Sequence, residues 1–121
     1  MKQHSSGFLR LVVDAKSRIT EINASDLAKK MASNIAFYLI DVREQDEYKQ
    51  GFIPQAIHLS KGIIERDIEK QIPDYTADIV VYCSGGFRSC LVADNLKKMG
   101  YQNVSSLTGG FRVWLKTELS T

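Results

Sequence analysis

The pattern of hydrophobic and polar residues along the chain alternates between segments typical of strands and segments typical of helices. Apolar, often β-branched runs of this length are typical of strands that are buried on both faces. Such runs occupy residues 36–42, 57–59, 79–83 and 104–107, and residues 18–22 are expected to form a short edge strand. The run at residues 79–83 (IVVYC) is the clearest of them because no charged residue interrupts it.

Between these runs, apolar residues recur at the three- and four-residue spacing of a helix face. Helices are therefore expected within residues 8–19, 25–32, 44–50, 63–72, 89–99 and 110–119. We expect Ser25 to cap the second helix, and Gly51 and Gly100 to end the third and the fifth. The apolar stripe of the first helix is typical of packing on its own domain, although a helix lying on a membrane surface would show the same spacing.

Strands that alternate with helices predict an α/β fold, with a mainly parallel central sheet of about five strands and helices on both faces. No repeat or flexible linker divides the chain, so we expect one domain. Residues 1–18 are predicted to be a helical extension packed on that domain, which itself spans residues 19–119. Ligands of such folds bind at the carboxyl ends of the strands, where Cys83 stands.

Composition excludes several classes of function. A chain of 121 residues is long enough for one hydrophobic core. Its net charge of +2 does not favour binding to nucleic acid or to an anionic membrane. No apolar stretch is long enough to cross a bilayer. The two cysteines, Cys83 and Cys90, form no disulfide framework, and a reducing, cytoplasmic compartment is expected.

The loop that follows the best strand carries the candidate chemistry. It consists of Cys83, Ser84, Gly85, Gly86, Phe87, Arg88 and Ser89. Three features of the loop would favour a thiolate and an anionic ligand. They are the N-terminus of the helix that follows, the amides turned inward at the two glycines, and the Arg88 guanidinium. The alternative is a tight turn that contains a buried cysteine.

This loop resembles the active-site loop of the rhodanese family, including its Cys-x-x-Gly-x-Arg-Ser form. Two further segments are similar to motifs of that family. They are the stretch from Asp41 to Leu59 (DVRE, then EY, then GFIPQAIHL) and the stretch from Leu107 to Phe111 (LTGGF) with Trp114 behind it. Phe52 and Gln55 depart from the residues that are frequent in the family, His and Gly. The resemblance covers roughly residues 19–119, almost the whole chain, and implies a rhodanese-like domain.

The resemblance implies a sulfurtransferase. Cys83 would take the outer sulfur of a small anionic donor such as thiosulfate and carry it as a persulfide. A thiol, cyanide or a protein sulfur acceptor would then receive that sulfur. Amides from Ser84 to Ser89 would hold the persulfide, and Arg88 would bind the donor. No cofactor is implied, and no His/Cys cluster with metal-ligand spacing is present in the sequence.

Other charged and reactive residues have structural or open interpretations. Asp41 and Arg43 are expected to form ion pairs near the strand end, for example with Glu47 or Arg88. His58 is expected to pack or to hydrogen-bond, and His4 lies in the N-terminal segment. Cys90 falls in the first turn of a helix, where a packing role and a redox role with Cys83 both remain open.

Two other classes of function stay open. Cys-based phosphatases and arsenate reductases also place a cysteine and an arginine around an oxyanion. Phosphatases of this fold, however, have Cys-x5-Arg, whereas Cys83 and Arg88 enclose four residues, the length associated with sulfur. A sulfur relay or a noncatalytic binding module of the same fold is the third interpretation.

Overall fold

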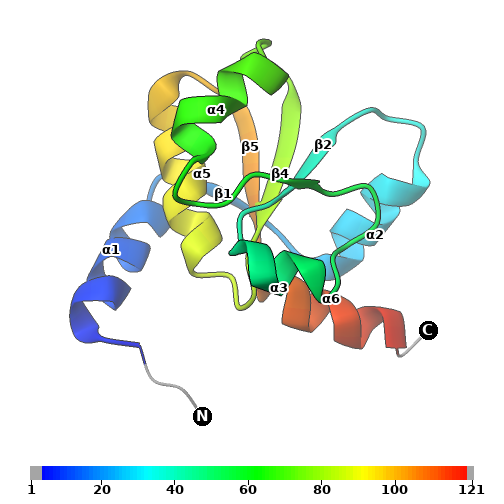
Figure 1. The fold of residues 1–121 in the computed structure, drawn as a ribbon, viewed down its shortest axis with the longest axis horizontal. Coiled ribbons are helices and arrows are strands. Elements are labelled where there is room, and N and C mark those ends of the chain that lie inside the picture. The colour runs from blue at the N-terminus through cyan, green and yellow to red at the C-terminus, as the bar shows by residue number, and fades with distance from the viewer. Residues whose placement is uncertain (1–3, 120–121) are drawn as a thin grey trace.

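A fully parallel five-stranded sheet runs through the centre of the computed structural model, which describes residues 4–119 (Figure 1). Its strands lie in the order β1-β5-β4-β2-β3. They span Thr20–Ile22 (β1), Tyr38–Asp41 (β2), Ile57–His58 (β3), Asp78–Tyr82 (β4) and Asn103–Leu107 (β5). Every neighbouring pair is parallel, so all carboxyl ends meet at one edge of the sheet. The predicted α/β class and strand number are confirmed.

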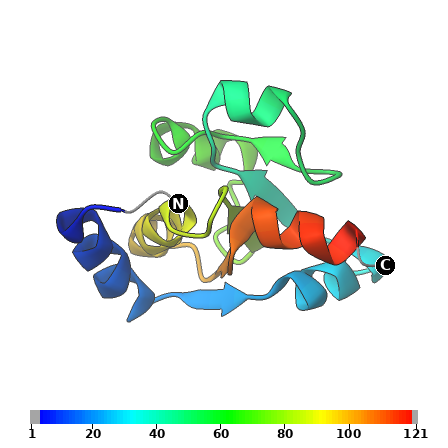
Figure 2. The ribbon, with the colours of Figure 1, turned by 90° about the horizontal axis from the view of Figure 1, so that it is seen from below.

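Six helices cover this sheet and confirm the predicted helical segments. They span Ser6–Lys16 (α1), Ala24–Ala32 (α2), Gln45–Lys49 (α3), Ile64–Gln71 (α4), Arg88–Met99 (α5) and Gly110–Leu119 (α6). Figure 2 shows α1 and α5 on one side of the sheet and α2 and α6 on the other. Helices on both faces explain why the strands read as continuous apolar runs rather than as an alternating pattern.

The core is divided by the sheet into two layers. Successive residues of a strand point to opposite faces. Ile40 and Val81 therefore pack in the layer beneath α4 and α5. Val80 and Tyr82 pack in the layer beneath α2 and α6. Because β4 is the middle strand and its last four residues are buried, the chain that leaves it is held from both sides.

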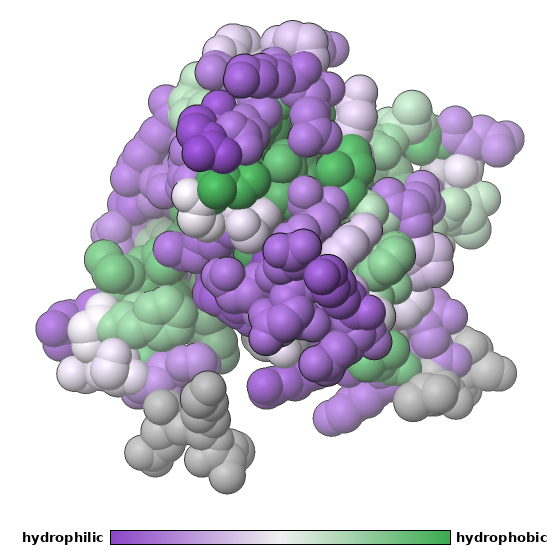
Figure 3. Space-filling model, in the orientation of Figure 1, coloured by the Kyte–Doolittle hydropathy of each residue, from purple (hydrophilic) through white to green (hydrophobic). Residues whose placement is uncertain are grey.

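Helix α1 packs on α5 through Val12 and Ala15, which form a buried cluster with Cys90. Leu11 shares the apolar spacing of this helix, but 58% of its surface is exposed. The apolar residues over α1 are visible at the lower left of Figure 3. The first three residues of the predicted extension lie outside the described residues, and the division of the chain at residue 18 stays a prediction.

One predicted helix start is wrong. Asn23, not Ser25, caps α2, because its side chain accepts a hydrogen bond of 2.7 Å from the Asp26 N–H. The helix therefore begins at Ala24. Within residues 4–119, no helix is long and apolar enough to cross a membrane.

Gln55 is the one described non-glycine residue with a left-handed backbone, at φ 68°. This conformation costs a side-chain-bearing residue roughly 1 kcal/mol, which glycine avoids. We expect Gln55→Gly to raise the free energy of unfolding by about 0.5 kcal/mol, after the greater freedom of the unfolded chain is subtracted. Urea denaturation measures the change. Gln55→Ala is the control and should match the wild type; a glycine variant less stable than the alanine variant would contradict the argument.

Candidate functional site

Cys83 is the first residue after β4 and is 1% exposed. Helix α5 begins at Arg88, so residues 83–87 form the turn between strand and helix at the carboxyl edge of the sheet. This edge is where ligands bind in parallel α/β folds. The cysteine predicted from the strand pattern is therefore located at the expected place.

Two backbone amides point at the sulfur of Cys83. The Gly86 N–H lies 3.2 Å and the Ser89 N–H 3.3 Å from Sγ, and both donate to it. The Cys83 thiol in turn donates to the Ser89 hydroxyl at 3.5 Å, and this hydroxyl lies 2.8 Å from the buried Ser106 hydroxyl. A thiolate in the same place could accept from the hydroxyl as well as from the two amides. Such a group of donors stabilises negative charge on sulfur, and the Ser89 amide lies at the N-terminus of a helix.

The first two carbonyl groups of the same loop, those of Cys83 and Ser84, accept hydrogen bonds from the start of α6. The Phe111 N–H donates to the Cys83 carbonyl at 2.8 Å, and the Arg112 N–H donates to the Ser84 carbonyl at 3.1 Å. The first amides of α6, which have no partner within their own helix, are thus satisfied by the loop. With these two carbonyls held by α6, the loop can turn the Gly86 and Ser89 amides toward Sγ.

This approach requires glycine on both sides. A Cβ at Gly110 would lie 2.7 Å from the Ser84 carbonyl oxygen, and one at Gly86 would lie 2.8 Å from the Gly109 nitrogen. Gly86, Gly109 and Gly110 all have positive φ angles, between 61° and 94°. Gly109 and Gly110 thus form the entry to α6, at the place where the two backbones pack closely.

Arg88 forms a bidentate ion pair with Glu47 of α3, with distances of 2.8 and 3.0 Å. The hydrogen bonds from Arg88 lower the pKa of Glu47 to about 2. The same pair raises the pKa of Arg88. The charge of Arg88 is therefore neutralised by Glu47, which the sequence analysis offered as a partner for the charged residues at the end of β2.

Asp41 and Arg43 pair with each other and not with Glu47 or Arg88. Their ion pair, 2.7 Å long, is buried, and Arg43 also donates to the Gly51 carbonyl at 2.7 Å. The Tyr82 hydroxyl donates to Asp41 at 2.8 Å, and burial raises the pKa of this phenol. The cluster joins β2 to β4 beneath the site and leaves the loop free of these charges.

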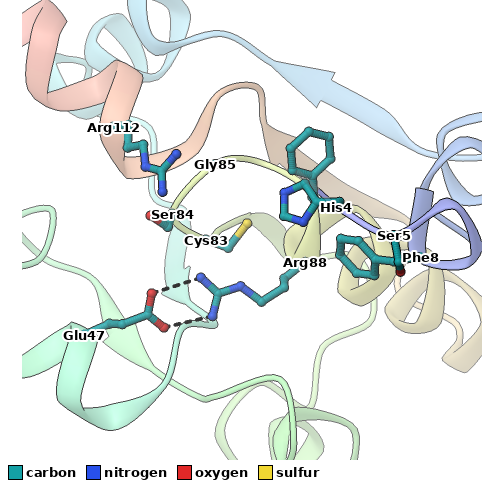
Figure 4. A pocket seen from close by; sticks show the side chains of 10 residues that line it. His4, Ser5, Phe8, Glu47, Cys83, Ser84, Gly85, Arg88 and Arg112 are labelled. Carbon is teal, nitrogen blue, oxygen red and sulfur yellow. Dashed lines mark hydrogen bonds and ion pairs between the residues drawn. The ribbon is translucent and has the colours of Figure 1, made fainter. Parts of the chain in front are cut away.

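The loop lines a pocket of about 630 Å³. Cys83, Ser84, Gly85, Phe87 and Arg88 line it, whereas the predicted site residues Gly86 and Ser89 contact Sγ from inside the fold. Sequence reasoning missed the remaining lining residues, which are His4, Ser5, Phe8, Glu47 and Arg112. Figure 4 shows these residues around the loop; they come from the segment before α1 and from α1, α3 and α6.

The apolar side of the pocket is aromatic. His4 packs edge-on against Phe87, with ring centroids 4.7 Å apart, and contacts Phe8 at 5.1 Å. The Phe8 spacing indicated a helix face, but no sequence signal linked it to residue 87. The other histidine, His58, stacks on Tyr48 and lies 2.7 Å from the Arg43 carbonyl oxygen.

Cys90 lies in the first turn of α5 and is fully buried. Its thiol donates to the Gly86 carbonyl at 3.1 Å, and burial raises its pKa. The thiol thus holds the carbonyl of Gly86, the residue whose own N–H donates to Cys83. Among residues 4–119, no group of three or more His, Cys, Asp or Glu is arranged to hold a metal ion.

Comparison with known proteins shows a consistent pattern. The rhodanese-like domain model matches residues 23–117. The thiosulfate sulfurtransferase GlpE of Coxiella burnetii is 38% identical over 97 residues, which are 80% of this chain and 85% of that protein. A sulfurtransferase of Allochromatium vinosum is 32% identical over 98 residues, which are 81% of this chain and 90% of that protein.

A solved structure from Rhodopseudomonas palustris superimposes with a TM-score of 0.80. The two sequences are 30% identical, and the match covers 98% of this chain and 96% of that one. The Rhodopseudomonas protein is described as a protein of unknown function and a possible tyrosine phosphatase.

Gly110→Ala tests the contact between α6 and the loop. We expect the free energy of unfolding to fall by about 2–3 kcal/mol, because the new Cβ meets two carbonyl oxygens at a strained φ. Urea denaturation gives the value. Gly62→Ala is the matched control, since a Cβ there meets nothing within 4 Å. Equal stability of the two variants would show that the close approach is not required.

The Glu47–Arg88 pair predicts a pH dependence. The pKa of Glu47 is lowered on folding, so its contribution to stability is present above about 4.5 and is lost as the pH falls toward 2. Because the pair is partly exposed to solvent, we expect Glu47→Gln to cost about 1 kcal/mol at pH 7. The variant should also show a shallower loss of stability in acid. Asp46→Asn, on the same helix, controls for the charge; an equal effect would exclude the ion pair as the cause.

Proposed function

This chain belongs to the rhodanese-like domain family, and on that premise we propose that it transfers a sulfane sulfur through a persulfide on Cys83. The donor would be thiosulfate or a similar small anion. The acceptor would be a thiophilic molecule such as a thiol, cyanide or a protein sulfur acceptor. The sulfurtransferases among its relatives support the general reaction. The proposal adds the nucleophile, the donor and the intermediate.

One observation carries this proposal: two amides and a hydroxyl surround the sulfur of Cys83. A thiolate is the nucleophilic form of cysteine, and donors aimed at Sγ favour it. The same donors would hold a persulfide anion after transfer, as an oxyanion hole holds developing charge. No general base is needed if the loop itself stabilises the thiolate.

The first half-reaction would form one bond and break one. The Cys83 thiolate attacks the outer sulfur of thiosulfate, the S–S bond of the donor breaks, and sulfite leaves with the bonding electron pair. The product is a Cys83 persulfide anion. In the second half-reaction, cyanide or a thiolate attacks the terminal sulfur, and Cys83 leaves as a thiolate. Two separate steps through a covalent intermediate predict ping-pong kinetics.

The rest of the loop would form the binding surface. Ser84, Gly85 and Phe87 line the pocket beside the sulfur, and Gly86 and Ser89 supply the amides. Arg88 is proposed to bind the donor, but with Glu47 on its guanidinium it acts as part of a neutral pair. No bound cofactor or metal is part of the proposed reaction. Both cysteines are free thiols, which suits the proposed reducing, cytoplasmic compartment.

The Rhodopseudomonas structure makes phosphate ester hydrolysis the second candidate. Four residues between Cys83 and Arg88 form a shorter loop than the Cys-x5-Arg loop of phosphatases. Glu47, the carboxylate in the pocket, is paired with Arg88, and its pKa of about 2 leaves it without a proton to donate near neutral pH. The sulfur reaction needs no such acid.

Intact-mass measurement after treatment with thiosulfate tests the proposal. We expect the wild type to gain one sulfur atom, and Cys83→Ser to gain none, because the hydroxyl cannot form a persulfide. Cys90→Ser is the matched control and should still gain the sulfur. The persulfide should disappear when cyanide is added, with release of thiocyanate.

The alternatives give different results in the same experiment. Hydrolysis of an aryl phosphate without any sulfur adduct would establish the phosphatase. No adduct with several sulfane donors, and no hydrolysis, would favour a binding module. An adduct that is insensitive to cyanide but is passed quickly to one protein acceptor would favour a sulfur relay.

A further inference from the structure

Two arginines reach the pocket, and their electrostatic environments differ. Arg88 is held by both carboxylate oxygens of Glu47. The Arg112 guanidinium also lines the pocket, but no carboxylate among residues 4–119 pairs with it. Figure 4 shows it on the opposite side of Cys83 from the Glu47–Arg88 pair. Arg112 is therefore the fixed positive charge of the pocket that an incoming anion can use.

The backbone of Arg112 is attached to the loop that it faces. Its N–H donates to the Ser84 carbonyl at 3.1 Å, and the Phe111 N–H holds the neighbouring Cys83 carbonyl. A Cβ built on Gly85 would lie 4.0 Å from Arg112 Nη1. The guanidinium thus extends over the loop from an anchored helix start, while its side chain remains exposed. A charge in this position serves neither the core nor an ion pair of the fold.

We propose that Arg112 binds the distal oxyanion of the sulfur donor and makes the protein prefer dianionic donors to monoanionic ones. The dianionic donor is inorganic thiosulfate, and the monoanionic donors are organic thiosulfonates. In both, the outer sulfur is bonded to a sulfur atom that carries oxygens. This inference rests on the proposed function, because it assigns the recognition of the donor in that reaction.

Charge balance at the reacting sulfur atoms favours a free cation in the pocket. A Cys83 thiolate and a thiosulfate dianion repel each other at contact, and the neutral Glu47–Arg88 pair offsets little of this repulsion. The planar guanidinium of Arg112 presents several N–H donors, which match the oxygens of a sulfonate. The attraction between Arg112 and the donor grows with the negative charge of the donor, so binding of a monoanion should depend on Arg112 less.

Both donors react by the same step, which makes the comparison direct. The thiolate attacks the outer sulfur, the S–S bond breaks, and the leaving group departs with the electron pair. The leaving group is sulfite from thiosulfate and benzenesulfinate from benzenethiosulfonate. The two donors differ in charge by one unit at the end that Arg112 is proposed to bind.

The experiment compares kcat/KM for thiosulfate and benzenethiosulfonate, with cyanide as the acceptor, in the wild type and Arg112→Gln. We expect the variant to lose about tenfold with thiosulfate, the worth of one charge-assisted hydrogen bond, mostly through KM. With benzenethiosulfonate it should lose about threefold or less. Arg112→Lys should recover part of the preference, because it keeps the charge without the planar group.

Lys116→Gln is the matched control, since it removes one positive charge from the exposed surface of the same helix. It should leave the ratio of the two donors unchanged. An equal loss in this control would show a general field effect and overturn the assignment. Urea denaturation of each variant should give wild-type stability, because the Arg112 side chain makes no contact that the fold needs.

The reaction proposed for Cys83 and the role proposed for Arg112 are contradicted by different results. If the wild type forms no persulfide with either donor, the proposed function is wrong. If the wild type forms the persulfide and Arg112→Gln keeps the same preference between the donors, only the assignment of Arg112 is wrong.

Discussion

The geometry of the site depends on the contact between the start of α6 and the loop after β4. Two amides of α6 bind the carbonyls of Cys83 and Ser84, and glycine at positions 86 and 110 permits the backbones to come this close. With its carbonyls engaged on that side, the loop directs its amides to the sulfur. One contact therefore satisfies the exposed end of a helix and orients the donors of the site.

Four charged residues near the site form two separate ion pairs with different environments. Asp41 and Arg43 are buried, and the Tyr82 hydroxyl and the Gly51 carbonyl complete their hydrogen bonds. Such a pair stabilises a fold only when its members remain bonded to each other. Glu47 and Arg88 are partly exposed at the pocket, where a ligand can reach them. Because the two pairs are separate, Asp41 and Arg43 do not line the pocket, whereas Glu47 and Arg88 do.

Much of the fold and the centre of the site could be predicted, because local patterns carry them. The apolar runs and the helical spacing specified the five strands and their alternation with helices. The position of Cys83 followed from the strand that precedes it. The helix cap at Asn23 was missed because Ser25, two residues later, offers an equally good capping side chain, and only backbone geometry selects between them.

The amino-acid sequence by itself determined the fold class, the strand that precedes Cys83 and the composition of the loop, since each depends on residues close together in the chain. Only the tertiary structure decided which charges pair and which side chains reach the pocket. Glu47 meets Arg88 across 41 positions, and His4 and Arg112 come to the same pocket from opposite ends of the chain. The physical reason is that ion pairs and pocket walls depend on distances in space, which local periodicity does not encode.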